Sequence, residues 1–133
     1  MLKVGFVCVH NSLRSQIAEA MFNHYGKSIA EAYSAGTETK NQINPDAVRI
    51  LKAYKGIDMS RQKSKLIDTL PKLDIRLTMG CEVECPTVFA RFYDVWDLED
   101  PTGQPDSAFI KTIDLIETKI LKLIKEIKAG KYN

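Results

Sequence analysis

Short, almost wholly apolar runs alternate along this chain with longer segments whose apolar residues recur every three or four positions. Val4 to Val9 is such a run and is typical of a strand that is buried on both faces. Helical spacing follows from Arg14 to Tyr25 and stops at Gly26. Its apolar members are Ile17, Ala18, Met21, Phe22 and Tyr25. The start of the chain therefore predicts a strand, a tight loop and a helix.

Two further long helices are predicted downstream. Asn44 caps the first, Pro45 is its first residue, and Gly56 closes it. Its inner stripe is Ala47, Ile50, Leu51 and Tyr54. Asp106 or Ser107 caps the last helix. Its apolar stripe is Ile110, Ile113, Ile116, Ile120, Ile124 and Ile127. We assign this stripe to packing against the core.

The remaining elements complete an alternating α/β pattern. The further strands are Ala30 to Ser34, Asp74 to Met79 and Phe92 to Trp96. Ser64 to Leu70 predicts a short helix. This alternation predicts one three-layer domain over residues 1–133, with a parallel sheet covered by helices on both faces. Because ligands bind beyond the carboxyl ends of such strands, we expect Cys8, Cys81 and the segment after Trp96 to meet at one edge.

Composition and charge exclude several classes of protein. The 133 residues are 44% apolar and 27% charged, as in an ordinary globular domain. A net charge of +2 is too small to indicate nucleic acid or a membrane surface as partner. Neither a membrane-spanning run of about 20 apolar residues nor a signal-peptide pattern occurs, so we expect a cytoplasmic protein. We also expect a monomer. Three cysteines argue against a secreted disulfide scaffold and raise the question of reactive thiols or a metal site.

The loop between the first strand and the first helix carries the candidate chemistry. A loop of this length that enters a helix can turn successive N–H groups inward around a tetrahedral oxyanion. Arg14 adds a planar fork for two oxygens, and the positive field favours the thiolate of Cys8, a nucleophile. No acidic residue occurs from Met1 to Gln16 to weaken that field. The predicted oxyanion-binding residues are Val9, His10, Asn11, Ser12, Leu13, Arg14 and Ser15.

Each member of this loop also has a plainer interpretation. Cys8 fits a small core residue followed by a surface arginine, although the strand and helix on either side argue against that. We predict that Asn11 braces the turn. Ser15 either donates its hydroxyl to the thiolate or caps the helix. His10 is either a proton carrier or, as we favour, an exposed loop histidine.

The segment from Val7 to Ala20 resembles the phosphate loop of the low-molecular-weight tyrosine phosphatase family, and specifically its arsenate reductase branch. The likeness continues through Tyr33 to Gly36, Asn44-Pro45, Thr78 to Cys81 and Asp100-Pro101. It implies a four-stranded parallel sheet with helices on both sides and arsenate or phosphate as the ligand. It also implies catalysis without a bound cofactor, and thioredoxin as reductant in preference to a low-molecular-weight thiol.

An acidic segment follows the last predicted strand. Asp100 differs from its acidic neighbours because Pro101 restricts its backbone and gives the side chain a defined direction. The resemblance implies that Asp100 is the general acid that protonates the departing oxygen. Asp97 and Glu99 are the alternatives, and a turn with no catalytic part is the remaining interpretation.

Two further cysteines separate the reductase from the phosphatase. A phosphatase needs only the nucleophile, the arginine and the acid, whereas Cys81 and Cys85 permit a relay of disulfide exchange. We predict that Cys81 attacks the sulfur of the arsenic adduct and that Cys85 resolves the resulting disulfide. A zinc site is poorly supported because the two histidines, His10 and His24, lie far away in sequence. Two inert cysteines are the plainest alternative.

The chain departs from the family pattern at two places near the loop. Leu13 stands where relatives often carry a small residue or another cysteine, which the relay does not require. Some arsenate reductases of the family bind a monovalent cation through an acidic residue at the place of Lys65. We predict that the ammonium of Lys65 replaces this cation beside Asn11, Glu19 and Ser34, and that no metal is bound. A solvated lysine is the alternative.

Reduction of arsenate to arsenite is therefore the predicted activity, and two other functions remain open. A tyrosine phosphatase is disfavoured because Gln16 replaces a proline that is common in that branch and Thr102 replaces an aromatic residue. Weak phosphatase activity is compatible with a reductase, since phosphate and arsenate share shape and charge. A non-enzymatic phosphate-binding module would not need the nucleophile or the acid.

Overall fold

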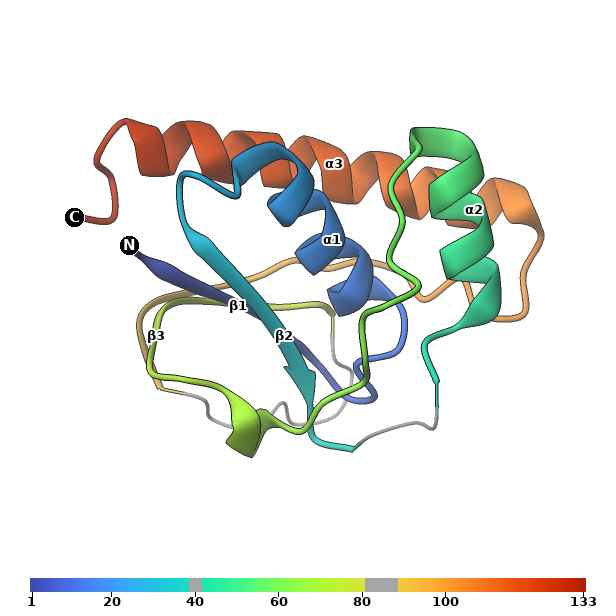
Figure 1. Cartoon of the computed structure of the whole chain (residues 1–133), viewed down its shortest axis with the longest axis horizontal. Helices are drawn as coiled ribbons and strands as arrows, with labels where there is room; N and C mark the ends of the chain where they lie inside the picture. The colour runs from blue at the N-terminus through green and yellow to red at the C-terminus, as the bar shows by residue number, and fades with distance from the viewer. Residues whose placement is uncertain (39–41, 81–88) are drawn as a thin grey trace.

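Four parallel strands form the centre of the computed structural model, which describes residues 1–38, 42–80 and 89–133 (Figure 1). They are β1 (Lys3–Cys8), β2 (Glu31–Gly36), β3 (Leu73–Thr78) and β4 (Ala90–Val95), in the spatial order β2-β1-β3-β4. Cys8 pairs with Gly36 on one side, and Val7 pairs with Thr78 on the other. The carboxyl ends of the strands thus lie at one edge, and the predicted four-stranded parallel sheet is confirmed.

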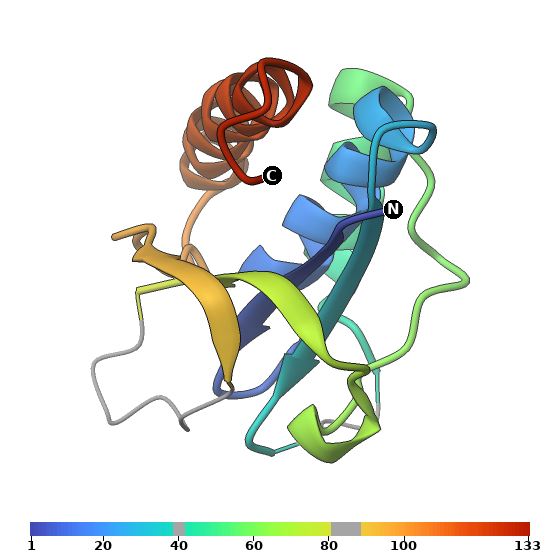
Figure 2. The ribbon, with the colours of Figure 1, turned by 90° about the vertical axis from the view of Figure 1, so that its left-hand side faces the viewer.

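In the part of the chain that the structure describes, three α-helices accompany the sheet: α1 (Arg14–Gly26), α2 (Pro45–Lys55) and α3 (Asp106–Lys128). Figure 2 shows them on the same side of the sheet, with α3 packed against both of the others. The 3-10 turn η1 (Ile67–Thr69) lies on the other side, where the chain crosses from β2 to β3 (Figure 2). We expected helices on both faces, and in the described residues the second face has this single turn.

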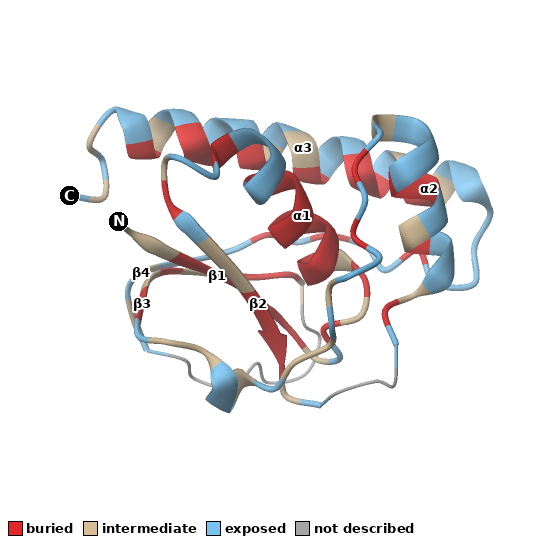
Figure 3. Cartoon of the chain, viewed as in Figure 1, coloured by how far each residue is buried: buried red, intermediate tan, exposed pale blue. Residues whose placement is uncertain are grey.

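The first strand and helix are the most deeply buried elements. Every residue of β1 after Lys3 is buried, and most of α1 is covered around its whole circumference (Figure 3). Phe6 packs its ring against Phe22 and Trp96 at centroid distances of 6.2 and 5.7 Å. Tyr25, the last apolar residue at helical spacing in this segment, is 41% exposed, and its hydroxyl donates to Glu117 of α3. The amphipathic ring thus keeps its polar end in water.

The predicted limits of α2 are confirmed. The Asn44 side chain accepts hydrogen bonds from the N–H groups of Asp46 and Ala47, and Gly56 ends the helix in the left-handed region at φ 70°. Tyr54 was expected in the inner stripe but is 43% exposed, because its hydroxyl donates to Asp114 of α3. α2 therefore meets α3 through polar groups at its edge as well as through its apolar face.

The last helix begins differently from the prediction. Its N-cap is Pro105 and no side chain caps it, so neither Asp106 nor Ser107 serves as the cap. Asp106 is the first helical residue, and its carboxylate accepts from Arg49 of α2 instead. Ile110 is only partly buried, and Phe109 takes the inner place at that end of the stripe. Among the described residues, no helix combines the length and apolarity that a membrane span needs.

The short helix predicted for Ser64 to Leu70 is reduced to η1. The preceding residues are held in extended conformation by the first loop and by β2. The backbone N–H of Lys65 donates to Asn11 Oδ1, and the carbonyl of Lys65 accepts from the N–H of Gly36. These bonds use the backbone groups that a helix would need for itself.

Candidate active site

The loop after β1 lies at the carboxyl edge of the sheet and leads directly into α1. Cys8 is the last residue of β1, and Leu13 is the N-cap of α1. No side chain caps this helix, and its first turn contains no acidic residue. The N-terminal end of the helix therefore keeps its positive partial charge for the loop in front of it.

The carbonyl groups of the loop are all tied to protein donors outside it. Val9 O accepts from the N–H of Glu38, His10 O from Ser64 Oγ, and Asn11 O from Gln16 Nε2. Ser12 O and Leu13 O accept from the N–H groups of Asn44 and Ile17. In a trans peptide the N–H points away from the carbonyl, so the N–H groups of residues 10–14 face the inside of the loop. Such a ring of amides suits a tetrahedral oxyanion.

The sulfur of Cys8 lies at the base of this ring and has two hydrogen-bond partners. Cys8 is 5% exposed, and its Sγ accepts from the backbone N–H of Asn11 at 3.1 Å. Ser15 Oγ lies 2.9 Å from the same sulfur, and Asn11 Nδ2 donates to this hydroxyl at 2.9 Å. Ser15 is therefore part of the sulfur's surroundings and does not cap the helix. Asn11 is in the left-handed region at φ 51°, a conformation that asparagine adopts more readily than most residues.

Gly36 lets the loop pass directly over the end of β2. A Cβ atom at this position would lie 2.4 Å from Val9 O and 2.9 Å from the Asn11 nitrogen. Both neighbours are backbone atoms, so neither can move without moving the loop. Gly36, the last residue of β2, is thus a point of close backbone approach.

Arg14 is fixed at the edge of the loop by the segment that follows β4. Its guanidinium donates to the carbonyl of Leu98 at 2.6 Å. Gly80, at φ 66°, lies against the same two groups, since a Cβ there would be 2.9 Å from Leu98 O and 3.3 Å from Arg14 Nη1. The ends of β3 and β4 therefore meet the loop at Arg14, as expected from the sheet.

The candidate acid is close to this contact in the chain. Asp100 follows Leu98 by two residues, is exposed, and accepts at Oδ1 from the backbone N–H and the hydroxyl of Thr102. The turn after Asp100-Pro101 thus gives its carboxylate a set direction. Asp97 and Glu99 line a separate pocket of about 250 Å³ between this segment and α3.

The predicted supporting residues divide into two groups. Lys65 Nζ lies 3.5 Å from Glu19 Oε1 and donates to the carbonyl of Lys63, and the Lys65 backbone holds Asn11. Ser34 is fully buried, but within the described ranges its hydroxyl has no hydrogen-bond partner. His10 is exposed, as we favoured, and its Nδ1 lies 3.4 Å from Glu38.

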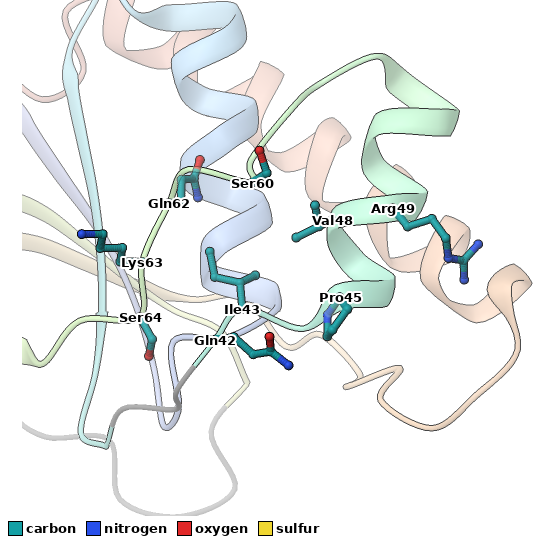
Figure 4. Close-up of a pocket in the computed structure, with 9 residues that line it drawn as sticks. All are labelled: Gln42, Ile43, Pro45, Val48, Arg49, Ser60, Gln62, Lys63 and Ser64. Atoms are coloured by element: carbon teal, nitrogen blue, oxygen red, sulfur yellow. The ribbon is translucent and has the colours of Figure 1, made fainter.

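Sequence reasoning missed two glutamines behind the loop. Gln16 is fully buried on α1 and donates from one amide nitrogen to Asn11 and to the carbonyl of Lys63. Gln62 donates to Gln16 in turn. The available signal was a glutamine among the buried positions of α1, since a buried amide must find partners. Figure 4 shows Gln62 on the segment beside α1, at a pocket of about 620 Å³.

The two remaining cysteines, Cys81 and Cys85, lie outside the described residues. The strand end that leads to them is placed, because Met79 follows β3 and its N–H donates to the carbonyl of Val7 in β1. In residues 1–38, 42–80 and 89–133, no three His, Cys, Asp or Glu side chains form a group that could hold a metal ion.

A cysteine sulfur beneath inward N–H groups, with an arginine at the edge of the loop, is an arrangement typical of an enzyme that binds a tetrahedral oxyanion. The family model described as "Low molecular weight phosphotyrosine protein phosphatase" matches residues 3–133. The chain belongs to this family. Within it, an arsenate reductase of Brevibacillus brevis is 38% identical over 124 residues, which cover 90% of this chain and 91% of the relative. A glutaredoxin arsenate reductase of Synechocystis is 33% identical over 132 residues, which cover 96% and 99%.

Solved structures of the phosphatase family agree with these relatives. An arsenate reductase in the phosphate-binding state superposes with a TM-score of 0.87 at 32% identity, covering 96% of this chain and 99% of its own. A thioredoxin-dependent arsenate reductase of Corynebacterium glutamicum has a TM-score of 0.78 at 32% identity, covering 98% of this chain and 63% of its own. The predicted resemblance to the arsenate reductase branch, and with it the prediction of an enzyme, is confirmed.

Proposed function

We propose that this chain reduces arsenate to arsenite, with Cys8 as the nucleophile. The thiols of Cys81 and Cys85 supply the two electrons and end as a disulfide. The observation that carries the proposal is the loop itself. Its carbonyls from Val9 to Leu13 are bonded outward, and the N–H of Asn11 donates to the sulfur of Cys8. The relatives named arsenate reductase support arsenate as the oxyanion.

The first step forms a covalent adduct. The Cys8 thiolate attacks the arsenic of bound arsenate and a sulfur–arsenic bond forms. The bond from arsenic to one hydroxyl group breaks, and this hydroxyl receives a proton from Asp100 and leaves as water. Arg14 and the inward N–H groups of residues 10–14 hold the remaining oxygens and balance their negative charge. Leu98 supports this role of Arg14, because its carbonyl fixes the guanidinium at the edge of the loop.

The second step reduces arsenic. The Cys81 thiolate attacks Cys8 Sγ, a Cys8–Cys81 disulfide forms, and the electron pair of the broken sulfur–arsenic bond stays on arsenic, which leaves as arsenite. Cys85 then attacks Cys81, which forms a Cys81–Cys85 disulfide and releases Cys8 as a thiolate. The two electrons come from the two distal thiols, so the chain needs no bound cofactor.

The resulting disulfide must be reduced by an external dithiol. We propose thioredoxin in a cytoplasmic setting, because a structural neighbour is a thioredoxin-dependent arsenate reductase and the chain carries its own resolving cysteine. The Synechocystis relative is a glutaredoxin arsenate reductase, so glutaredoxin is the competitor to test beside it.

Serine variants of the three cysteines test the proposal. Arsenate turnover coupled to thioredoxin and thioredoxin reductase is followed for Cys8→Ser, Cys81→Ser and Cys85→Ser, with hydrolysis of p-nitrophenyl phosphate measured in parallel. We expect Cys8→Ser to lose both activities, by about 10³-fold or more, since it removes the nucleophile. Cys81→Ser and Cys85→Ser lose repeated arsenate turnover but retain hydrolysis.

One result would reverse this assignment. If Cys81→Ser and Cys85→Ser both reduce arsenate at the wild-type rate, the relay is wrong and a phosphatase is the better description. A phosphatase is the second candidate, because the matching family model describes phosphotyrosine phosphatases. Thr102 argues against it, since its hydroxyl donates to Asp100 where that branch usually has an aromatic residue.

A further inference from the structure

A continuous chain of hydrogen bonds runs from the surface segment after α2 to the sulfur of Cys8. Gln62 Nε2 donates to Gln16 Oε1 at 2.7 Å, and Gln16 Nε2 donates to Asn11 Oδ1 at 2.8 Å. Asn11 Nδ2 donates to Ser15 Oγ at 2.9 Å, and Ser15 Oγ lies 2.9 Å from the sulfur. Gln16, Asn11 and Ser15 are fully buried, so water does not compete with these bonds.

Backbone groups fix the direction of every amide in this chain. Lys65 N–H can only donate, and it lies 2.8 Å from Asn11 Oδ1, which leaves Nδ2 of that amide for Ser15. The carbonyl of Lys63 can only accept, and it lies 2.8 Å from Gln16 Nε2. Gln16 therefore presents its oxygen to Gln62, whose nitrogen also reaches the Gln16 carbonyl at 3.1 Å.

The consequence appears at Ser15. Its oxygen already accepts from Asn11, so its own hydrogen is free for the sulfur, and the bond stabilises a thiolate that can only accept. Because all four donors point the same way, each bond polarises the next. The common direction of these four hydrogen bonds therefore favours the ionised form of Cys8.

We propose that Gln62 and Gln16 are positioning residues that stabilise the Cys8 thiolate through Asn11 and Ser15. The proposal rests on the proposed function only in taking Cys8 as the nucleophile. Gln62 is the accessible end of the chain, half-buried at the pocket in Figure 4, and it can be changed without opening the core. It contacts neither Cys8 nor the inside of the loop, so its effect passes through Gln16.

Two substitutions of Gln62 separate this role from simple packing. Gln62→Met keeps the length but removes the donor, and Gln62→Glu keeps the shape but places a second acceptor against Gln16 Oε1. In a Cys81→Ser, Cys85→Ser background, the rate of Cys8 alkylation by iodoacetamide is measured between pH 4 and pH 9. We expect the midpoint of this profile to rise by about 0.5 pH unit in Gln62→Met, which is about threefold less thiolate below the midpoint. Gln62→Glu raises it further.

Gln42, which lines the same pocket as Gln62, provides matched control variants. Gln42 is exposed and lines that pocket, so Gln42→Met and Gln42→Glu repeat the change of side chain and of charge without touching the chain of bonds. Both should keep the wild-type midpoint. The proposal is overturned if Gln62→Met keeps it too, or if Gln62→Glu lies nearer to wild type than Gln62→Met, as packing alone would predict. Alkylation needs neither arsenate nor the distal cysteines, so its outcome is separate from that of the turnover assay.

Discussion

The missing side chain of Gly36 sets how closely the loop after β1 can approach β2. A methyl group there would overlap Val9 O and the Asn11 nitrogen, and both atoms belong to the backbone that shapes the loop. The importance of this glycine therefore comes from its neighbours and not from a special φ angle. It belongs to the site even though it contributes no functional group.

Gly36→Ala should displace the loop and weaken oxyanion binding. We expect the dissociation constant for phosphate to rise at least about tenfold and the free energy of unfolding to fall by about 1–3 kcal/mol, as in other overpacked sites. Isothermal titration calorimetry and urea unfolding measure the two quantities. Gly56→Ala is the control, because Gly56 has a positive φ but open space around it. It should lose stability and keep phosphate affinity.

The ammonium of Lys65 is predicted to replace a bound monovalent cation, and this prediction can be tested. This ammonium lies 3.5 Å from the carboxylate of Glu19. If this charge replaces a bound cation, arsenate reduction should be the same in potassium and sodium chloride at equal ionic strength. Steady-state rates of wild type and Lys65→Met measure this. A severalfold activation of the wild type by potassium alone would contradict the assignment.

The helices α1, α2 and α3 are joined by one acidic side chain, Glu117. Glu117 of α3 accepts from the hydroxyl of Tyr25 in α1 and pairs with Lys55 of α2 at 3.0 Å. Burial raises the pKa of Glu117, but the hydrogen bonds from Tyr25 and Lys55 and the nearby positive charge of Lys55 together lower it more, so that the pKa lies below its ordinary 4.5. The carboxylate therefore favours the folded state in its ionised form.

The pH dependence of stability follows from that direction. Because the pKa is lower in the folded state, the contribution is complete above 4.5 and is lost as the pH falls through the folded value. Glu117→Gln should cost about 1 kcal/mol at pH 7 and much less at pH 3, as measured by urea unfolding. Glu126→Gln on the same helix is the control, since its partner Lys131 is largely exposed. A Glu117→Gln cost independent of pH would refute the argument.

Element boundaries were predictable where the signal is local. The apolar run of β1, the Asn44 cap and the Gly56 stop each act within a few residues, and all three are where the sequence placed them. The segment from Ser64 to Leu70 has local helical character, but the loop after β1 takes its backbone hydrogen bonds. The start of α3 was missed for a related reason, because Arg49 of another helix uses the carboxylate of Asp106.

For the molecule as a whole, we propose a single cooperative unit. Trp96 is the only tryptophan, and it is buried between the end of β4 and α3, with its ring against Phe6. Its fluorescence reports the sheet side of the core, whereas far-ultraviolet circular dichroism reports mainly the helices. The two urea transitions should coincide if residues 1–133 form one domain. A fluorescence transition at lower urea would indicate two units.

The sequence by itself determined the α/β class, the order of the strands and helices along the chain, and the loop from Cys8 to Arg14. These features depend on periodicity and on residue types a few positions apart, which any conformation of the chain retains. The family resemblance extended this to the acid and the distal cysteines. For Cys81 and Cys85, which lie outside the described residues, the relay stays a prediction.

Only the tertiary structure decided what holds the loop in its active shape. Gln62 meets Gln16 across 46 positions, and Arg14 meets the carbonyl of Leu98 across 84. Glutamine or a backbone carbonyl at these places carries no local signal, because each acts through a partner that the sheet order brings beside it. The reactive groups of the loop can therefore be identified from residues close together in the sequence. The hydrogen bonds that hold the loop in place join segments that lie far apart in the chain.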